Sequence, residues 1–222
     1  MSMTIPYGAR RVLTNMLLMT LLYAGHANAR TIRIVVLGDS LTAGYGLSAP
    51  EGFQAVMEAA LRATGRDVRL VDAAVSGDTS AGGLARLDWA LATPELAGAP
   101  FGVFVELGAN DGLRALPAPE MERNLGTIID RLQAAHIPVL LSGMLAPPNL
   151  GRAYADAFAA VYQQLGARPG VQFDPFFLVG IAGDRTLNQP DNIHPNAEGV
   201  RRETARLLPA MISLADTVAA LP

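Results

Sequence analysis

A serine, a histidine and an aspartate in this chain have the types and positions that acyl transfer requires. Ser40 follows the alternating, β-branched residues 32–37, which predict a strand. Asp191 and His194 stand three residues apart, just before the predicted last helix. A serine hydroxyl attacks a carbonyl carbon when an imidazole takes its proton and a carboxylate orients that imidazole. We therefore expect Ser40 to be the nucleophile, His194 its base and Asp191 the group that orients the base.

Two further strand ends carry groups that could stabilise the oxyanion of such a reaction. Gly77 follows the second predicted strand and Asn110 follows the third. Acyl transfer needs hydrogen-bond donors aimed at the developing negative charge. The amide N–H groups of Ser40 and Gly77 and the side-chain amide of Asn110 could supply three of them. Glycine at position 77 would let the backbone approach a substrate with no Cβ in the way.

Each of these positions also has an ordinary structural interpretation. Ser40 could be only a helix N-cap, residues 76–78 a plain turn and residues 110–112 an Asx turn. Asp191 could lie near the positive end of a helix dipole. Taken singly, the structural interpretation is favoured at every position, whereas their joint occurrence favours a catalytic site. His136, between a predicted helix and a predicted strand, is interpreted as structural.

Alternating strands and helices would position these groups. Strands are predicted at residues 32–37, 68–75, 101–107, 137–141 and 171–173. Helices are predicted at residues 52–64, 84–91, 121–132 and 154–165, and from Pro195 onward, with Pro209 bending or ending the last one. Five such repeats predict a doubly wound parallel sheet that helices cover on both faces. Open α/β sheets bind their ligands at the carboxyl ends of the strands, where the candidate residues fall.

The first 29 residues have the pattern of a secretory signal. Arg10 and Arg11 precede the apolar residues 12–23, and Ala27-Asn28-Ala29 is a small-x-small cleavage site. A membrane anchor is the alternative, but about twelve apolar residues are too few to span a bilayer. We therefore expect cleavage before Arg30, no stable membrane anchor afterwards, and a single domain over residues 30–222.

Composition excludes several other classes of protein. The chain has no cysteine, so disulfides and thiolate nucleophiles are excluded, and its 17 basic residues are all arginine, which excludes a lysine nucleophile or a Walker A lysine. Loss of Arg10 and Arg11 would change the formal charge from −3 to −5, which argues against a nucleic-acid partner. Thr42 stands where the Gly-x-Ser-x-Gly elbow needs glycine, and no Gly-x-Gly-x-x-Gly follows the first strand. A metal site on His194 would lack further histidine or cysteine ligands, so we expect no metal and no cofactor.

Four blocks of this sequence together resemble those of the GDSL, or SGNH, hydrolase family. They are Gly38-Asp39-Ser40-Leu41, Ser76-Gly77-Asp78-Thr79, Gly108-Ala109-Asn110-Asp111 and Asp191-Asn192-Ile193-His194-Pro195. The likeness extends over nearly all of residues 30–222, in order and with suitable spacing. Residues 37–46, 108–114 and 144–151 most resemble the exported bacterial arylesterase and acyl-CoA thioesterase/lysophospholipase branch.

The resemblance implies a fold and a set of roles. The fold is a three-layer α/β/α sandwich around a five-stranded parallel, flavodoxin-like sheet. Ser40 is implied as nucleophile, Asp191 and His194 as the rest of the triad, and Gly77 and Asn110 as part of the oxyanion hole. Asn192 departs from the glycine that relatives often have there, which puts the turn that holds Asp191 in question.

The expected activity is hydrolysis of small carboxylic esters, and of acyl thioesters or lysophospholipids by the resemblance. Leu113, Met144 and Leu145 would favour apolar acyl or aryl groups. Residues 144–151 could form a wall of the acyl groove or a rigid connector, and the sequence leaves open whether they move. Two alternatives remain: a carbohydrate O-deacetylase with the same catalytic groups, and a non-catalytic exported binding protein. The sequence fixes neither chain length nor oligomeric state.

Overall fold

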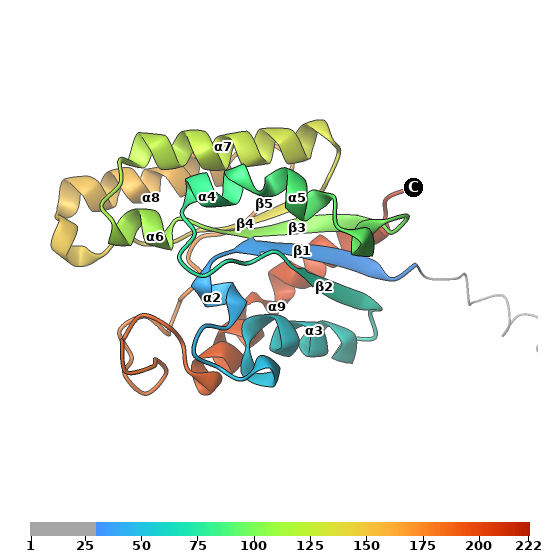
Figure 1. Ribbon diagram of the computed structural model, residues 1–222, viewed down its shortest axis with the longest axis horizontal. Helices are drawn as coiled ribbons and strands as arrows, with labels where there is room; N and C mark the ends of the chain where they lie inside the picture. Colours follow the sequence, from blue (N-terminus) through green and yellow to red (C-terminus); the bar gives the residue numbers. More distant parts are fainter. Residues whose placement is uncertain (1–29) are drawn as a thin grey trace, which may run out of the picture. The chain divides into compact units, whose positions relative to one another are not determined.

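The fold is built on a parallel sheet whose strand order is β2-β1-β3-β4-β5 (Figure 1). The computed structural model describes residues 30–222, so the predicted signal peptide lies outside the described residues. All four pairs of neighbouring strands are parallel. The strands are β1 (Ile32–Gly38), β2 (Val68–Asp72), β3 (Phe101–Glu106), β4 (Val139–Ser142) and β5 (Val171–Asp174). The predicted five-stranded parallel sheet is thus confirmed.

Helices cover both faces of this sheet, as the sequence predicted. In Figure 1, α3 and α9 lie on one face, and α4, α5, α7 and α8 lie on the other. The α-helices are α2 (Ser40–Ala43), α3 (Phe53–Ala63), α4 (Ser80–Ala85), α5 (Leu87–Leu91), α6 (Ala109–Leu113), α7 (Ala118–Ala134), α8 (Arg152–Gly166) and α9 (Ala197–Ala219). Three short 3₁₀ turns accompany them: η1 (Ala49–Glu51), η2 (Pro94–Leu96) and η3 (Pro148–Leu150). None of the helices in residues 30–222 has the length and apolar character needed to cross a membrane.

Apolar side chains on both faces of the sheet hold the layers together. The central strand β1 is almost wholly buried, because it lies between two strands and two helical layers. On one face the rings of Phe53, Phe104 and Phe177 contact one another with centroids 5.5–6.1 Å apart. On the other face α7 buries a stripe at helical spacing that includes Met121, Leu125 and Ile129. Removal of this apolar surface from water is the main stabilising contribution to such a fold.

Several element boundaries differ from the predictions, three of them for a clear physical reason. The strand β2 ends at Asp72, although Ala73 and Val75 still donate backbone hydrogen bonds to the β1 segment. One predicted helix over residues 84–91 is two short helices that meet at Arg86. The last helix starts at Ala197 rather than Pro195, because the Asn196 side chain caps it.

Pro209 does not end the last helix, so that part of the prediction is wrong. The helix α9 continues through Pro209 to Ala219. Leu207 and Met211, on either side of the proline, are both buried. Packing of this long apolar face therefore outweighs the local cost of the proline.

The strand order places the candidate site. The chain leaves β1 for β2 on one side and later returns to β3 on the other, so the order reverses between β1 and β3. Such a switch point opens a crevice beyond the carboxyl ends of the strands. Ser40 follows β1 and Asn110 follows β3, so both residues flank this crevice.

Candidate active site

The side chains of Ser40, His194 and Asp191 form one chain of hydrogen bonds. Ser40 Oγ lies 2.9 Å from His194 Nε2, and His194 Nδ1 lies 2.6 Å from Asp191 Oδ2. The first of these contacts joins residues at opposite ends of the sequence, since the segment between β5 and α9 lies beside α2 (Figure 1). This geometry allows a proton to pass from the hydroxyl to an imidazole that a carboxylate orients.

Asp191 adopts its position through a local turn. Its Oδ1 accepts hydrogen bonds from the backbone N–H groups of Ile193 (2.9 Å) and His194 (3.0 Å), while Oδ2 faces the imidazole. Asn192, between them, has a φ of +58°, a conformation that asparagine tolerates better than most residues. The alternative that Asp191 starts a helix is wrong, because α9 begins only at Ala197.

The same hydrogen bonds keep the Asp191 carboxylate charged. Partial burial acts to raise its pKa, but the bonds from Ile193 N–H, the His194 ring and His194 N–H outweigh this and lower the pKa to about 2. The group that faces the imidazole is therefore an anion throughout the neutral range. An anion there orients the ring and stabilises its protonated form.

The turn after β1 leaves the Ser40 hydroxyl available to His194. Asp39, and not Ser40, is the N-cap of α2, since its Oδ1 accepts from Leu41 N at 3.0 Å. The interpretation of Ser40 as only a helix cap is therefore wrong. Ser40 is the first helical residue, and its own amide N–H donates no hydrogen bond within residues 30–222.

Gly77 presents a second backbone amide near the site. Asp78 N donates to Val75 O at 3.1 Å and closes a turn in which Gly77 has a φ of +87°. A positive φ at this position is typical of a type II turn and favours glycine. Arg114 Nη2 donates to Gly77 O at 2.7 Å, and Gly77 N–H has no acceptor among the described residues. Residues 76–78 thus form the turn that the structural interpretation predicts. Within the described residues, this turn leaves the Gly77 N–H without an acceptor.

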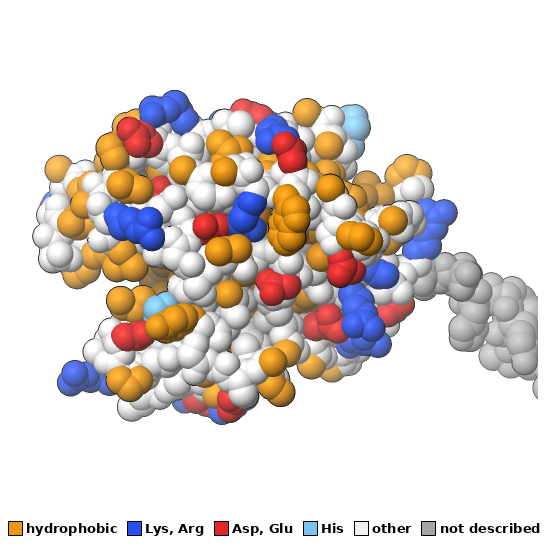
Figure 2. Space-filling view, in the orientation of Figure 1, with side chains coloured by type: hydrophobic (Ala, Val, Ile, Leu, Met, Phe, Trp, Pro, Cys, Tyr) orange, Lys and Arg blue, Asp and Glu red, His pale blue; other side chains and the backbone are white. Residues whose placement is uncertain are grey.

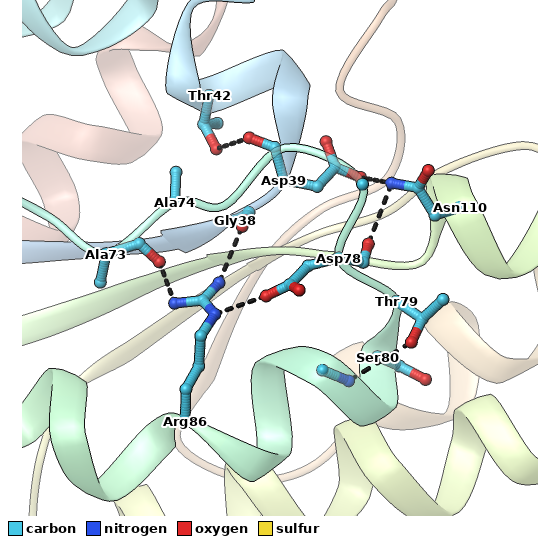
Figure 3. A network of polar contacts seen from close by, with 12 residues as sticks. Gly38, Asp39, Thr42, Ala73, Ala74, Asp78, Thr79, Ser80, Arg86 and Asn110 are labelled. Carbon is cyan, nitrogen blue, oxygen red and sulfur yellow. Dashed lines mark hydrogen bonds and ion pairs between the residues drawn. The ribbon is translucent and has the colours of Figure 1, made fainter.

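Asn110 lies in α6 and bridges the two loops that carry Ser40 and Gly77 (Figure 3). Its Nδ2 donates to Asp39 Oδ2 at 3.0 Å and to Asp78 O at 2.9 Å. The Asx-turn alternative is wrong, because Gly112 N, which such a turn would bond to Asn110 Oδ1, donates to Gly108 O at 3.0 Å instead. Both amide hydrogens are engaged within the protein, so a bond to a substrate oxygen would require Asn110 to share one of them.

Sequence reasoning missed two residues that contact the histidine loop. The ring of Tyr45 lies over that of His194 with centroids 4.5 Å apart. Gln189 Nε2 donates to Tyr45 O at 2.7 Å and to Pro195 O at 3.0 Å. Tyr45 lies within residues 37–46, but the sequence pattern there indicates no role for its ring. Gln189 fell in a segment with no periodic pattern, so nothing local indicated its contact.

Asp39 and Glu106 are buried carboxyl groups directly behind the nucleophile. Burial raises the pKa of Asp39 to about 6, although hydrogen bonds from Leu41 and Asn110 act in the opposite direction. Burial also raises the pKa of Glu106 well above its ordinary value, and the nearby Asp39 charge adds to this. Thr42 Oγ1 is 3.5 Å from Glu106 Oε2, whereas Glu106 Oε1 has no hydrogen-bond partner within residues 30–222. Two acids that share a buried site therefore oppose each other's ionisation.

Replacement of Asp39 with asparagine is expected to change how stability depends on pH. An acid with a raised folded-state pKa stabilises the protein below its unfolded pKa of 3.8, and that contribution is lost as pH rises through about 6. The parent should therefore lose stability between pH 4 and pH 7, so the free energy of unfolding of Asp39→Asn should rise relative to that of the parent over this range. The difference is on the order of 3 kcal/mol, or several degrees in Tm. Thermal unfolding of both proteins across this range measures it.

The exposed Asp88 gives a control for the substitution itself, since Asp88→Asn makes the same chemical change at a surface site. Parallel Tm profiles for Asp39→Asn and the parent would show that Asp39 titrates at its ordinary value.

An apolar cavity opens beside Ser40. Its volume is about 520 Å³, and among the described residues no Asp, Glu or Arg lines it. All three residues predicted to bind substrate, Leu113, Met144 and Leu145, lie in its wall. Figure 2 shows hydrophobic side chains around a hollow between the region of α6 and α8 and the segment that precedes α9. The other lining residues are Ser40, Leu41, Ala109, Asn110, Ala146, Pro147, Pro148, Phe176, Leu178, Ala182, Gly183, Asn192 and Ile193.

Two other expectations concern groups away from this chain of hydrogen bonds. His136 is exposed after α7 with a φ of +56°, away from the described site. Within residues 30–222, no three His, Cys, Asp or Glu side chains gather in an arrangement that could hold a metal ion.

The fold and these four blocks define the class of protein. Residues 36–202 match the GDSL-like Lipase/Acylhydrolase family, and the chain belongs to this family. The chemistry of the site can therefore be compared with that of other members of the family.

Individual relatives make the class more specific. Esterase TesA of Pseudomonas aeruginosa is 40% identical over 186 residues, which cover 84% of this chain and 90% of the relative. Thioesterase 1/protease 1/lysophospholipase L1 of Escherichia coli K12 is 38% identical over 74% of this chain and 76% of the relative. The crystal structure of the psychrotrophic esterase EstA from Pseudoalteromonas sp., inhibited by monoethylphosphonate, has a TM-score of 0.71 and 34% identity over 82% of this chain and 98% of that one.

Proposed function

We propose that this protein hydrolyses carboxylic esters of apolar acids through an acyl-enzyme on Ser40. One observation carries the proposal: the continuous hydrogen-bonded chain from Ser40 Oγ through His194 to Asp191, at the mouth of an apolar cavity. The esterases among its relatives support the same reaction class. A non-catalytic binding protein would not need this chain of groups.

In the first half of the reaction, Ser40 Oγ attacks the ester carbonyl carbon while His194 Nε2 takes the hydroxyl proton. The Asp191 carboxylate stabilises the imidazolium that forms. The tetrahedral intermediate then collapses, and His194 returns the proton to the alcohol as it leaves. In the second half, His194 takes a proton from water while the water oxygen attacks the acyl carbon. The acyl–Oγ bond then breaks, the acid is released, and His194 returns the proton to Ser40 Oγ.

The oxyanion would lie between the Ser40 and Gly77 amides, with Asn110 as a third donor. The first two donors have no other acceptor within the described residues, so they are ready to bind a developing negative charge. Asn110 would contribute by sharing one of the two Nδ2–H groups that it donates to Asp39 Oδ2 and to Asp78 O.

The cavity favours an apolar acyl or aryl group over a sugar. Within the part of the chain that the structure describes, its polar side chains are those of Ser40, Asn110 and Asn192, of which the first two serve the reaction. A carbohydrate deacetylase would need more donors and acceptors for sugar hydroxyls, so this alternative is less well supported. Acyl thioesters and lysophospholipids are further candidate substrates, since one relative is named for both activities.

A fluorophosphonate probe tests the nucleophile directly, because it phosphonylates an activated serine. We expect the folded protein to be labelled at Ser40, and the peptide that contains this residue to carry the adduct in mass spectrometry. Ser48→Ala is a matched control, since Ser48 is an exposed serine near the same turn. Rates for p-nitrophenyl esters and acyl-CoAs of increasing length would then define the acyl preference. Absence of labelling on an intact, folded protein would refute the proposal.

Replacement of Asn110 with alanine is expected to lower kcat by roughly 10²- to 10³-fold if its amide stabilises the oxyanion. KM should change little, because the donor acts mainly on the transition state. Asn124→Ala is the control, since that amide donates to Ser80 Oγ at 3.0 Å and does not line the cavity. Unchanged kcat in Asn110→Ala would exclude the residue from the oxyanion hole.

We further propose that the protein is exported and that its mature domain consists of residues 30–222. The support is the charged, apolar and small-x-small pattern of residues 1–29. N-terminal sequencing of protein recovered outside the cytoplasm of an expressing bacterium should begin at Arg30.

A further inference from the structure

A single arginine, Arg86, connects the loops that carry the proposed oxyanion donors (Figure 3). It stands at the break between α4 and α5, and its side chain is only 15% exposed. The guanidinium donates to Gly38 O at 2.9 Å, to Ala73 O, and to Asp78 Oδ2 at 2.5 Å. One side chain thus holds two backbone carbonyls and one carboxylate at the same edge of the sheet.

These acceptors lie next to the donors of the proposed oxyanion hole. Gly38 is two residues before Ser40, at the end of β1. Asp78 directly follows Gly77, and its carbonyl oxygen accepts from Asn110 Nδ2 at 2.9 Å. Arg86 therefore bonds to residues that are next to Gly77 and two positions from Ser40 in the sequence, and it reaches the third donor, Asn110, through Asp78.

The backbone alone joins these loops only weakly. Regular pairing of β1 with β2 stops at Asp72, well before Gly77. Beyond that point the described backbone offers two bonds from this loop to β1, Ala73 N to Val36 O and Val75 N to Gly38 O. The arginine adds a rigid fork of donors across the gap, which is a geometry that lysine cannot reproduce.

A glycine in α4 leaves room for the contact between Asp78 and Arg86. A Cβ at Gly82 would lie 2.7 Å from Asp78 Oδ1, so glycine at that position lets the carboxylate reach Arg86. The carboxylate is itself largely buried, with 19% exposure, which strengthens a charge-assisted hydrogen bond.

We infer that Arg86 is a positioning residue for the oxyanion hole: its guanidinium fixes the Gly77 turn, and through Asp78 the Asn110 amide, against the turn that carries Ser40. This role rests on the proposed function and adds to it a residue that never contacts the substrate. A misplacement of about 1 Å caused by a distant substitution can cost on the order of a hundredfold in rate.

The test compares Arg86→Gln with the parent in three measurements. We expect kcat for p-nitrophenyl esters to fall by about tenfold to a hundredfold while KM stays within about twofold. The inhibition constant of an alkyl boronic acid, which forms a tetrahedral adduct with a serine hydroxyl, should rise by the same factor as kcat falls. A residue that only stabilises the fold would lower Tm and leave both quantities unchanged in the folded protein.

Arg168→Gln is the matched control. Arg168 also donates to a carboxylate, Asp130 (2.8 Å), and to a backbone carbonyl, Gly126 O (3.4 Å), but it does so between α7 and the end of α8. This variant should lose stability without a change in kcat or in boronic acid affinity.

If Arg86→Gln does not fold, Asp78→Asn tests the same inference with a smaller change. It removes the charged acceptor and keeps the side-chain shape, so kcat and boronic acid affinity should again fall together. Parent values of both in either folded variant would overturn the inference. Failure of the proposed function is distinguishable, because the parent itself would then resist fluorophosphonate labelling at Ser40.

Discussion

Replacement of Ser40 with alanine is expected to lower kcat for p-nitrophenyl esters by about 10⁴- to 10⁶-fold, as in other hydrolases with a serine triad. Among residues 30–222, the Ser40 hydroxyl is the candidate nucleophile that lies 2.9 Å from the His194 ring. Without it no acyl-enzyme can form, and residual turnover would come from binding and the oxyanion donors alone. Steady-state rates with purified protein, at equal folded fractions by circular dichroism, provide the measurement.

Ser48→Ala should retain the parent rate, which separates the loss of the nucleophile from a general effect of serine substitution near this turn. The burst of p-nitrophenol that accompanies acyl-enzyme formation should also disappear from Ser40→Ala. A Ser40→Ala protein that still turns over aryl esters at the parent rate would move the nucleophile elsewhere.

Replacement of His194 with alanine should be nearly as damaging, with kcat about 10⁴- to 10⁶-fold lower. The Ser40 hydroxyl would then have no base within hydrogen-bonding distance, because Asp191 contacts the imidazole rather than the serine. The double variant Ser40→Ala/His194→Ala should be no worse than either single variant, since the two residues act as one unit. Rates for all three proteins test both statements.

The exposed His136 supplies the control here, and His136→Ala should behave like the parent. If the losses of the two single variants multiplied in the double variant, Ser40 and His194 would be acting independently. That result would contradict a shared proton transfer.

The sheet and the groups at its edge could be predicted because their determinants are local. The β-branched residues of β1, the helical stripe of α7 and the turn residues after each strand each specify their own conformation. Parallel pairing then brings Ser40, Gly77 and Asn110 to one edge without further information.

The remaining contacts depend on pairs of residues that no local pattern connects. Asp39 has the sequence of an ordinary helix cap, and only the fold buries it beside Glu106 and Asn110. Gln189 and Arg86 belong to segments whose neighbours in space come from elsewhere in the chain. The course of α9 through Pro209 likewise follows from packing on the sheet and not from its own sequence.

Most of the cavity wall and the reacting groups at the strand ends come from different parts of the structure. Ser40, Gly77 and Asn110 lie in the turns that follow β1, β2 and β3, whereas most of the cavity wall comes from the connections at residues 144–148 and 176–183, which precede the loop of Asp191 and His194. Mutations in these two connections can reshape the space for the acyl chain while the strand ends keep their geometry. The architecture therefore lets substrate range diverge under selection, in nature or in directed evolution, at little cost to turnover.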